Sequence, residues 1–174
     1  MPGPRFAERL NQQIGHELAA HNQYLACAIH YEGLTMPQMA AYFYAQAMEE
    51  RSHALMMVQY LLDTDSQVAI PALEAPVSSF ADVVAPVELA LEQERRVSSQ
   101  INELVVIARA EADFASEQFL QWFIKEQVEE IASISALLAV VRRNSAVVES
   151  IEEYVAREGG GPGEDPSAPR AAGG

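Results

Sequence analysis

The sequence predicts an all-α protein, a four-helix bundle with a long crossover between its second and third helices and a short fifth helix at the C-terminus. Apolar residues recur at helical spacing in four long segments, and short breaks with turn-forming or capping residues separate most of them. One longer stretch, between the second and third segments, has no periodicity. The 174 residues are enough for one domain with a sizeable core and leave little room for a second.

The first predicted helix covers residues 6–33 and ends in Gly33, a residue suited to a helix C-cap. The second covers residues 36–63 and has Pro37 in its first turn, where the missing N–H costs no helical hydrogen bond. Periodicity then stops over residues 65–80. An extended segment of about 16 residues reaches about 50 Å, and a helix of about 28 residues spans about 42 Å. The connection can therefore run the full length of the bundle, so that the second and third helices lie parallel.

The third predicted helix covers residues 82–110, with Asp82 as a possible N-cap. The fourth covers residues 113–143, with Asp113 in the same role. A brief break precedes a short fifth helix at residues 146–157.

Two parts of the chain differ in composition. We interpret residues 1–157 as one domain, whereas residues 158–174 form a tail rich in Gly, Pro and Ala without a large apolar side chain. Such a tail cannot bury enough surface to fold, and we expect it to be disordered.

The overall charge and the cysteine content narrow the class of protein. A formal net charge of −14 argues against a nucleic-acid partner or an anionic membrane surface. No apolar run is long enough to span a membrane. The lone Cys27 cannot form an internal disulfide, which fits a reducing compartment, and we expect a cytoplasmic protein.

In each long helix, the row of side chains expected to face the core contains an acid near its middle. These rows contain Glu17; Glu50 with His53; Glu94; and Gln127 with Glu130. With the second and third helices parallel, the positions fall within about two turns of one plane. Other topologies would align mid-helix positions nearly as well, so this agreement is supportive only.

Several ionised carboxylates at one level of an apolar core would be very unfavourable, because desolvation and mutual repulsion both oppose them. They are either protonated or paired with cations, or the predicted rows are misphased. None of the 11 Lys and Arg residues stands on these rows, so bound metal is the remaining way to keep the acids ionised. The E-x-x-H motif formed by Glu50 and His53 is weak by itself, but carboxylates with imidazole suit iron or manganese.

Several segments together resemble the non-haem bacterial ferritins, most closely the type found in actinobacteria, and the resemblance covers residues 6–157. The segments are Gly15-His16-Glu17 with Tyr24, the run AMEERSHA at 47–54, Glu94, Gln121-Trp122-Phe123 and the run EQVEE at 126–130. The resemblance implies a ferritin-like fold with a di-iron centre. The implied ligands are Glu17, Glu50 and His53 for the first iron, then Glu50 as a bridge with Glu94 and Glu130 for the second, with Gln127 nearby.

The resemblance also assigns roles to residues around that centre. Glu49, Glu126 and Glu129 match a third, weaker iron site. Tyr24 and Trp122 match aromatic residues that supply electrons during oxygen reduction, although aromatic residues on such rows more often pack in the core.

The resemblance further implies that the chain binds no haem. Haem-binding bacterioferritins carry a second E-x-x-H in the fourth helix, where this chain has Gln127 and Glu130. Their haem-ligating Met follows the bridging Glu, where this chain has Arg51.

The implied function is iron storage and detoxification by a ferroxidase, which oxidises Fe(II) to Fe(III) with oxygen or peroxide as acceptor and stores a ferric mineral. The implied assembly is a homo-oligomer, a hollow shell of about 24 subunits (a 24-mer). The acids Glu111, Asp113 and Glu117 match a pore-lining segment of such shells, although acids near a helix N-terminus also stabilise its dipole.

Two alternatives remain open at this stage. Another di-iron or di-manganese carboxylate protein, such as a rubrerythrin-like peroxidase, would share the bundle, but rubrerythrins usually add a Cys-rich iron domain and a second E-x-x-H. A non-metal helical bundle acting as an interaction protein would leave the mid-helix acids unexplained.

Overall fold

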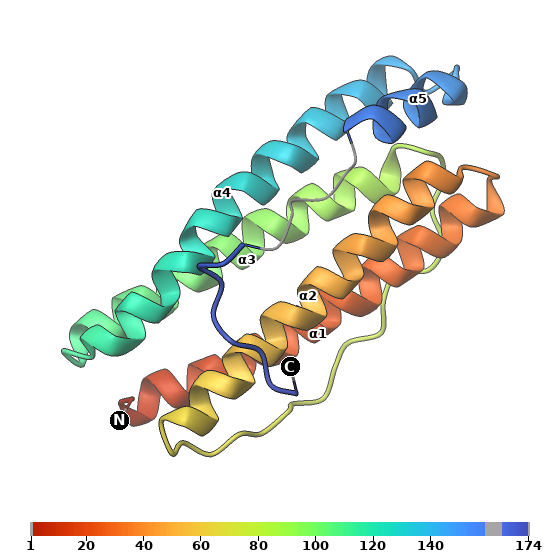
Figure 1. Cartoon of the computed structure of the whole chain (residues 1–174). Coiled ribbons are helices and arrows are strands. Elements are labelled where there is room, and N and C mark those ends of the chain that lie inside the picture. The colour runs from red at the N-terminus through yellow and green to blue at the C-terminus, as the bar shows by residue number, and fades with distance from the viewer. Residues whose placement is uncertain (1, 159–164, 174) are drawn as a thin grey trace.

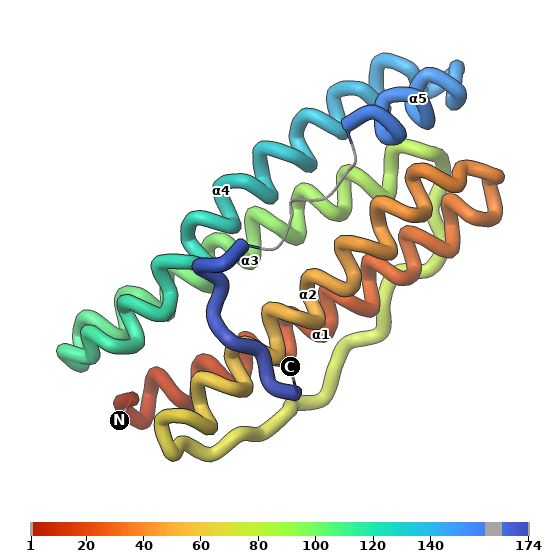
Figure 2. The backbone as a smooth tube through the Cα atoms, viewed as in Figure 1, coloured from red at the N-terminus to blue at the C-terminus, as the bar shows by residue number. Residues whose placement is uncertain are grey.

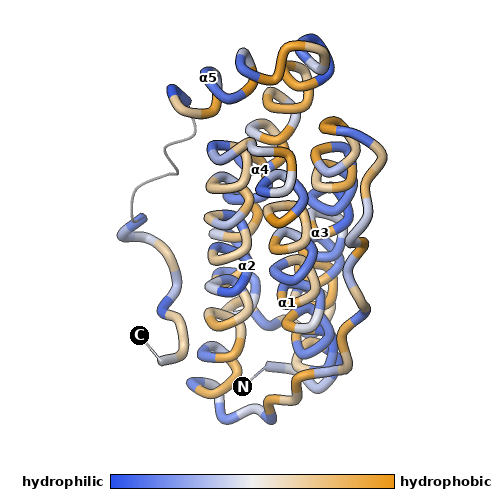
Figure 3. The backbone as a smooth tube through the Cα atoms, turned by 90° about the vertical axis from the view of Figure 1, so that its right-hand side faces the viewer, coloured by the Kyte–Doolittle hydropathy of each residue, from blue (hydrophilic) through white to orange (hydrophobic). Residues whose placement is uncertain are grey.

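The computed structural model describes residues 2–158 and 165–173, and these residues form helices without any strand. The helices are α1 (Pro4–Gly33), α2 (Pro37–Asp63), α3 (Ala85–Ala110), α4 (Phe114–Arg143) and α5 (Val148–Glu158). The first four are long and form the bundle, and α5 lies across one of its ends (Figure 1, Figure 3). The predicted all-α class and four-helix bundle are confirmed.

Two tight hairpins and one long connection join the four long helices. The α1–α2 and α3–α4 turns contain Thr35 and Ala112, which adopt left-handed φ angles of 59° and 54°. The connection between α2 and α3 runs along the bundle, so that these two helices point in the same direction (Figure 1). The predicted crossover is therefore confirmed, and it places mid-helix positions of all four helices at one level.

The ends of the helices agree with the sequence in part. Asp113 caps α4 as predicted, because its Oδ1 accepts a hydrogen bond from the N–H of Ser116 at 3.0 Å. Asp82 is not the N-cap of α3, which begins at Ala85. Asp82 instead accepts hydrogen bonds from the N–H groups of Val84 at 2.8 Å and Ala85 at 2.9 Å, and it braces the turn before the helix. Gly33 is the last residue of α1 rather than the residue with positive φ.

The core consists of two apolar clusters along the bundle. One, at the α5 end, includes Tyr31, Phe43 and Val141, and the other includes Phe6 and Leu104. Because α1 to α4 each contribute to both clusters, the residues between them in every helix form a middle layer. That layer holds the acids predicted from the sequence.

A carboxylate holds α5 against the bundle. Both oxygens of Glu152 accept backbone N–H groups at the start of α2, from Gln38 at 2.8 Å and from Met39 at 2.9 Å. These N–H groups have no partner within their own helix, and the helix dipole favours a negative charge there. Ile151 and Val155, which belong to α5, are buried and add an apolar contact with the bundle.

The C-terminal segment 165–173 lies along the bundle beside α2 (Figure 2). Arg170 forms an ion pair with Asp63 at 3.2 Å, and the N–H of Ala172 donates to the carbonyl oxygen of Leu55 at 3.0 Å. The sequence predicted a disordered tail, whereas these residues make polar contacts that a count of apolar side chains does not reveal. Residues 159–164 and 174 lie outside the described residues, and the division at residue 157 stays a prediction.

Within the described ranges, no helix combines the length and the apolar character that a membrane crossing requires.

Candidate metal centre

The four acids, the imidazole and the amide of the mid-helix positions are all buried in the interior. Their exposed fractions are 1% for Glu17, 3% for Glu50, 4% for His53, 0% for Glu94, 6% for Gln127 and 7% for Glu130. Such burial is rare for carboxylates, which are normally exposed or paired with cations. The predicted rows therefore face the core, and the cost of burying these charges needs a physical explanation.

Glu17, Glu50 and His53 form the first half of the group. Each offers one ligand atom, and these atoms lie within 4.8 Å of one another. His53 Nδ1 lies 3.8 Å from Oε2 of Glu17 and 3.5 Å from Oε2 of Glu50. Among the described residues, both of these oxygens are buried without a hydrogen-bond partner. Two unpartnered oxygens facing one imidazole nitrogen are the donor set that a hard divalent cation requires.

Glu94 and Glu130 form the second half, and Glu94 is held differently. The hydroxyl of Tyr24 donates to Oε1 of Glu94, and Nε2 of Gln127 donates to Oε2 at 2.9 Å. Oε1 of Gln127 is buried and has no hydrogen-bond partner within the described part of the chain. Gln127 thus contacts Glu94 through its amide nitrogen and has its oxygen free for a ligand.

The pKa values show how this layer behaves without metal. Burial raises the pKa of Glu94 to about 7 and that of Glu130 to about 8. Burial, followed by the charges of Glu94 and Glu17, raises the pKa of Glu50 well above its usual range, as expected for a carboxylate between two others. The metal-free layer therefore retains protons near neutral pH, and a bound cation would displace them.

Glu17 and His53 behave as a pair. Burial by itself would raise the pKa of Glu17, but the neighbouring imidazole lowers that pKa below its usual value. Burial by itself would lower the pKa of His53, but Glu17 and Glu50 beside it raise that pKa well above its usual value. The first half of the layer is therefore a carboxylate–imidazolium pair in the absence of metal.

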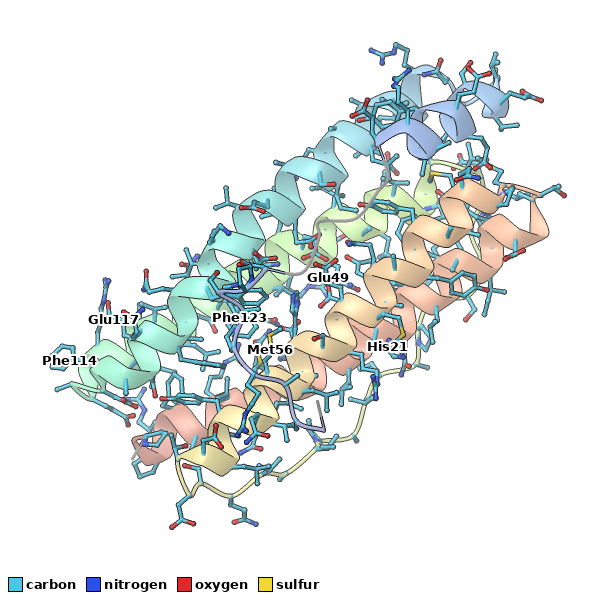
Figure 4. The ribbon with its side chains drawn as sticks, in the orientation of Figure 1. His21, Glu49, Met56, Phe114, Glu117 and Phe123 are labelled. Carbon is cyan, nitrogen blue, oxygen red and sulfur yellow. The ribbon has the colours of Figure 1, made fainter. Side chains whose placement is uncertain are left out.

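A second group of possible ligands lies beside the first. Glu49, His53 and Glu126 also bring one ligand atom each within 4.8 Å. Together with Glu129 and Met56 they line a cavity of about 850 Å³ between α2, α4 and the C-terminal segment. Figure 4 shows Glu49 and Met56 on α2 across from Phe123 on α4. The three acids of the predicted third site thus share a cavity, and His53 stands between it and the buried layer.

The two aromatic residues occupy different places. The hydroxyl of Tyr24 contacts Glu94 directly. Trp122 packs edge-to-face on His53 with ring centroids 5.6 Å apart, and its Nε1 donates to Oδ2 of Asp165 at 3.1 Å. The proposed electron-supplying roles stay predictions, but both side chains lie against residues of the layer.

Sequence reasoning missed two contributors to this region. Gln13 is fully buried, and its Nε2 donates to Oε1 of Glu17 at 2.8 Å. The signal was present, because Gln13 lies one helical turn before Glu17 on the same face. Asp165, which contacts Trp122, lies in the segment predicted to be disordered, and no local pattern distinguished it.

Two of the three acids near the start of α4 have partners within the chain, whereas Oε2 of Glu111 is buried without a hydrogen-bond partner among the described residues. Asp113 caps the helix, and Glu117 forms an ion pair with Arg109 at 2.8 Å. Figure 4 shows Glu117 and Phe114 at this end of the bundle. These contacts explain both acids by helix capping and pairing, so a pore role stays a prediction.

Comparison with known proteins identifies the family. Residues 7–144 match the family model described as a ferritin-like domain. The chain belongs to this family. Ferritin BfrB of Mycolicibacterium smegmatis is 47% identical over 170 residues, which cover 98% of this chain and 94% of that protein.

Two further similarities agree with this assignment. The bacterial non-heme ferritin of Staphylococcus aureus is 35% identical over 132 residues, covering 76% of this chain and 80% of that protein. The open-pore ferritin of the archaeon Archaeoglobus fulgidus has a TM-score of 0.87 at 29% identity, covering 92% of this chain and 99% of that chain. The predicted resemblance to non-haem bacterial ferritins is confirmed, and so is the ferritin-like fold.

Proposed function

We propose that this ferritin-like protein stores and detoxifies iron, and that its buried layer is a ferroxidase centre. The observation that carries the proposal is a pair of buried oxygens, Oε2 of Glu17 and Oε2 of Glu50. Both face Nδ1 of His53, and neither has a hydrogen-bond partner in residues 2–158 and 165–173. Without a metal ion, neither oxygen has a hydrogen-bond partner among the described residues, which is costly in the interior even with the charge of His53 nearby. Fe(II) as substrate would satisfy both and use the imidazole as a neutral third ligand.

Two Fe(II) ions would bind side by side. Glu17, Glu50 and His53 would hold the first, and Glu50 would extend to the second at Glu94 and Glu130. Two Fe(II) ions give up one electron each to become Fe(III), and dioxygen takes up both electrons with two protons to form hydrogen peroxide. With peroxide as acceptor, the same two electrons and two protons give two water molecules. Anionic oxygen ligands favour the higher charge of Fe(III), which drives the oxidation.

The cavity beside the centre gives the product a way out. Glu49, Glu126 and Glu129 line it, and His53 separates it from the buried layer. We propose that Fe(III) passes along these acids and mineralises beyond them. The absence of haem stays a prediction, which rests on Arg51 in place of the haem-ligating Met and on Gln127 and Glu130 in place of a second E-x-x-H.

The storage role requires a closed homo-oligomer, expected to be a 24-mer. Large apolar side chains are exposed on the single chain, including Ile29 at 63%, Val106 at 66%, Phe114 at 73% and Val128 at 67%. Contact between subunits would bury such side chains. Size-exclusion chromatography with light scattering tests this, because a shell of about 24 chains has a mass near half a megadalton. A cytoplasmic location stays a prediction.

The decisive experiment is anaerobic Fe(II) titration followed by exposure to oxygen. The unsubstituted protein should bind two Fe(II) per chain at the centre and then develop ferric absorbance. Glu17→Ala and Glu130→Ala should each lose one of the two ions and oxidise Fe(II) more slowly, whereas Glu32→Ala, on the exposed face of α1, should behave as the unsubstituted protein. Unchanged stoichiometry and rate in both Glu17→Ala and Glu130→Ala would contradict the proposed centre.

A further inference from the structure

The side chain of Gln13 contacts Oε1 of Glu17, whereas the other oxygen of Glu17 faces His53. Gln13 is 0% exposed, and all of its polar atoms have partners. Nε2 donates to Oε1 of Glu17 at 2.8 Å and to Oε1 of Gln100 on α3 at 3.2 Å. Oε1 accepts a hydrogen bond from Nη1 of Arg9 at 3.2 Å. The amide is therefore satisfied on both ends, which is what a buried amide requires to adopt one conformation.

These contacts also decide which way the amide points. If the amide were flipped, its oxygen would face the carboxylate of Glu17 and the oxygen of Gln100, and its NH₂ group would face the guanidinium of Arg9. Every contact would then be between two acceptors or two donors. The observed orientation is the one that directs an N–H at Glu17, and the charged donor on the far side of the amide strengthens that N–H as a donor.

The hydrogen bond from Gln13 makes the two oxygens of Glu17 different. Oε1 is taken by Gln13, whereas Oε2 has no hydrogen-bond partner among the described residues and lies 3.8 Å from Nδ1 of His53. Glu94 differs, because Tyr24 and Gln127 occupy both of its oxygens. One oxygen of Glu17 is thus free at the first position, whereas both oxygens of Glu94 at the second position already accept hydrogen bonds.

We propose that Gln13 is a positioning residue that presents Oε2 of Glu17 to the first metal ion and thereby sets the affinity of the first position but not of the second. Arg9 supports it from outside by fixing the amide. The inference rests on the proposed metal centre and adds to it a residue that would touch no metal. Without the amide, Glu17 can rotate or turn both oxygens away from His53, and a preorganised ligand is lost.

Stepwise binding of Co(II) without oxygen tests this, because Co(II) absorbs visible light according to its ligands and needs no oxidation. Gln13→Met keeps the length of the side chain and removes the donor. It should weaken the first binding step by about 10- to 100-fold, the usual cost of losing a residue that orients a ligand, and leave the second step within about twofold. The Co(II) spectrum of the first step should change as well, because Glu17 no longer presents one fixed oxygen.

The matched control is Gln12→Met, at the neighbouring position in the wall of a separate cavity between α1, α3 and the crossover. It should bind Co(II) in both steps as the unsubstituted chain does. Arg9→Met provides a second test at a partly exposed site and should weaken the same first step by a smaller factor. Circular dichroism and sizing check that each variant is folded.

Three results would overturn the inference. An unchanged first step in folded Gln13→Met would show that Glu17 needs no support. Equal weakening of both steps would show a general loss of structure rather than positioning. If Gln13→Met does not fold, an unchanged first step in Arg9→Met would decide against the inference. Failure of the unsubstituted chain to bind two Co(II) ions would instead contradict the proposed function on which the inference rests.

Discussion

The two halves of the buried layer use carboxylates in opposite ways. In the first half, Glu17 and Glu50 each have an oxygen that faces His53 and has no hydrogen-bond partner in the part of the chain that the structure describes. In the second half, Glu94 has both oxygens in hydrogen bonds from Tyr24 and Gln127. The first half therefore presents two free carboxylate oxygens to a cation, whereas in the second half the oxygens of Glu94 are occupied and the amide oxygen of Gln127 is free within the described part of the chain. We infer that the two metal ions bind in order, the first at the prepared position.

The largest effect is expected from Glu50, which faces both halves. Glu50→Ala should abolish binding of paired ions and slow Fe(II) oxidation by about 100-fold or more, because the second ion loses its bridge and the first loses a ligand. His53→Ala should weaken the first step while the second half keeps its acids. Stopped-flow absorbance on mixing Fe(II) with oxygen measures the rates. Equal rates for Glu50→Ala and the exposed control Glu32→Ala would contradict the bridging role of Glu50.

The raised pKa values predict an unusual dependence of stability on pH. On folding, the pKa of Glu94 rises from 4.5 to about 7 and that of Glu130 rises from 4.5 to about 8. Between the unfolded pKa of 4.5 and these raised values, the native state therefore binds more protons than the unfolded state. Metal-free stability should therefore fall as pH rises from about 5 to 8, by a few kcal/mol in total. Thermal unfolding of the metal-free protein across this range measures the slope.

The same experiment tests the contribution of the second half. Glu130→Gln removes one of the titrating acids and should flatten the slope, whereas Glu32→Gln should leave it unchanged. A bound divalent cation should remove the decline, since the ion replaces the displaced protons. A metal-free stability that rises from pH 5 to 8 would contradict protonated acids in the layer.

A smaller effect is expected when the second half is relieved of a hydrogen bond. Tyr24→Phe frees one oxygen of Glu94, so the second Co(II) step should tighten by up to about tenfold while the first stays unchanged. The metal-free protein should lose about 1 kcal/mol of stability, because the freed oxygen is buried. Weaker binding at the second step would show that Tyr24 orients Glu94 for metal rather than occupying it.

The smallest effect is expected at the C-terminal segment. Asp165→Ala removes the acceptor from the N–H of Trp122, the one tryptophan of the chain, so its fluorescence maximum should shift. Both Co(II) steps should stay within about twofold, because Asp165 contacts neither half of the layer. An unchanged fluorescence spectrum would show that the segment does not contact α4 in solution.

Much of the fold could be predicted because it depends on spacing within each helix. The periodic apolar rows and the mid-helix positions of Glu17, Glu50, Glu94 and Glu130 follow from the repeat of about 3.6 residues per turn. Some boundaries could not be predicted, since Asp82 can cap either a helix or the turn before it. The order of residues 165–173 could not be predicted for a related reason. These residues are held by polar and backbone contacts to residues that are distant in the sequence.

The class of fold, the family and the set of acids that share one level of the bundle could all be predicted, because they depend on residue type and helical period. Which oxygen of each acid is free could be seen only in the folded chain. That choice depends on donors from other helices or other turns, such as Gln127 on α4 for Glu94 on α3, and on Gln13 being held between Arg9 and Gln100. Hydrogen-bond partners are fixed by distance and angle in space, and the order of residues does not contain either.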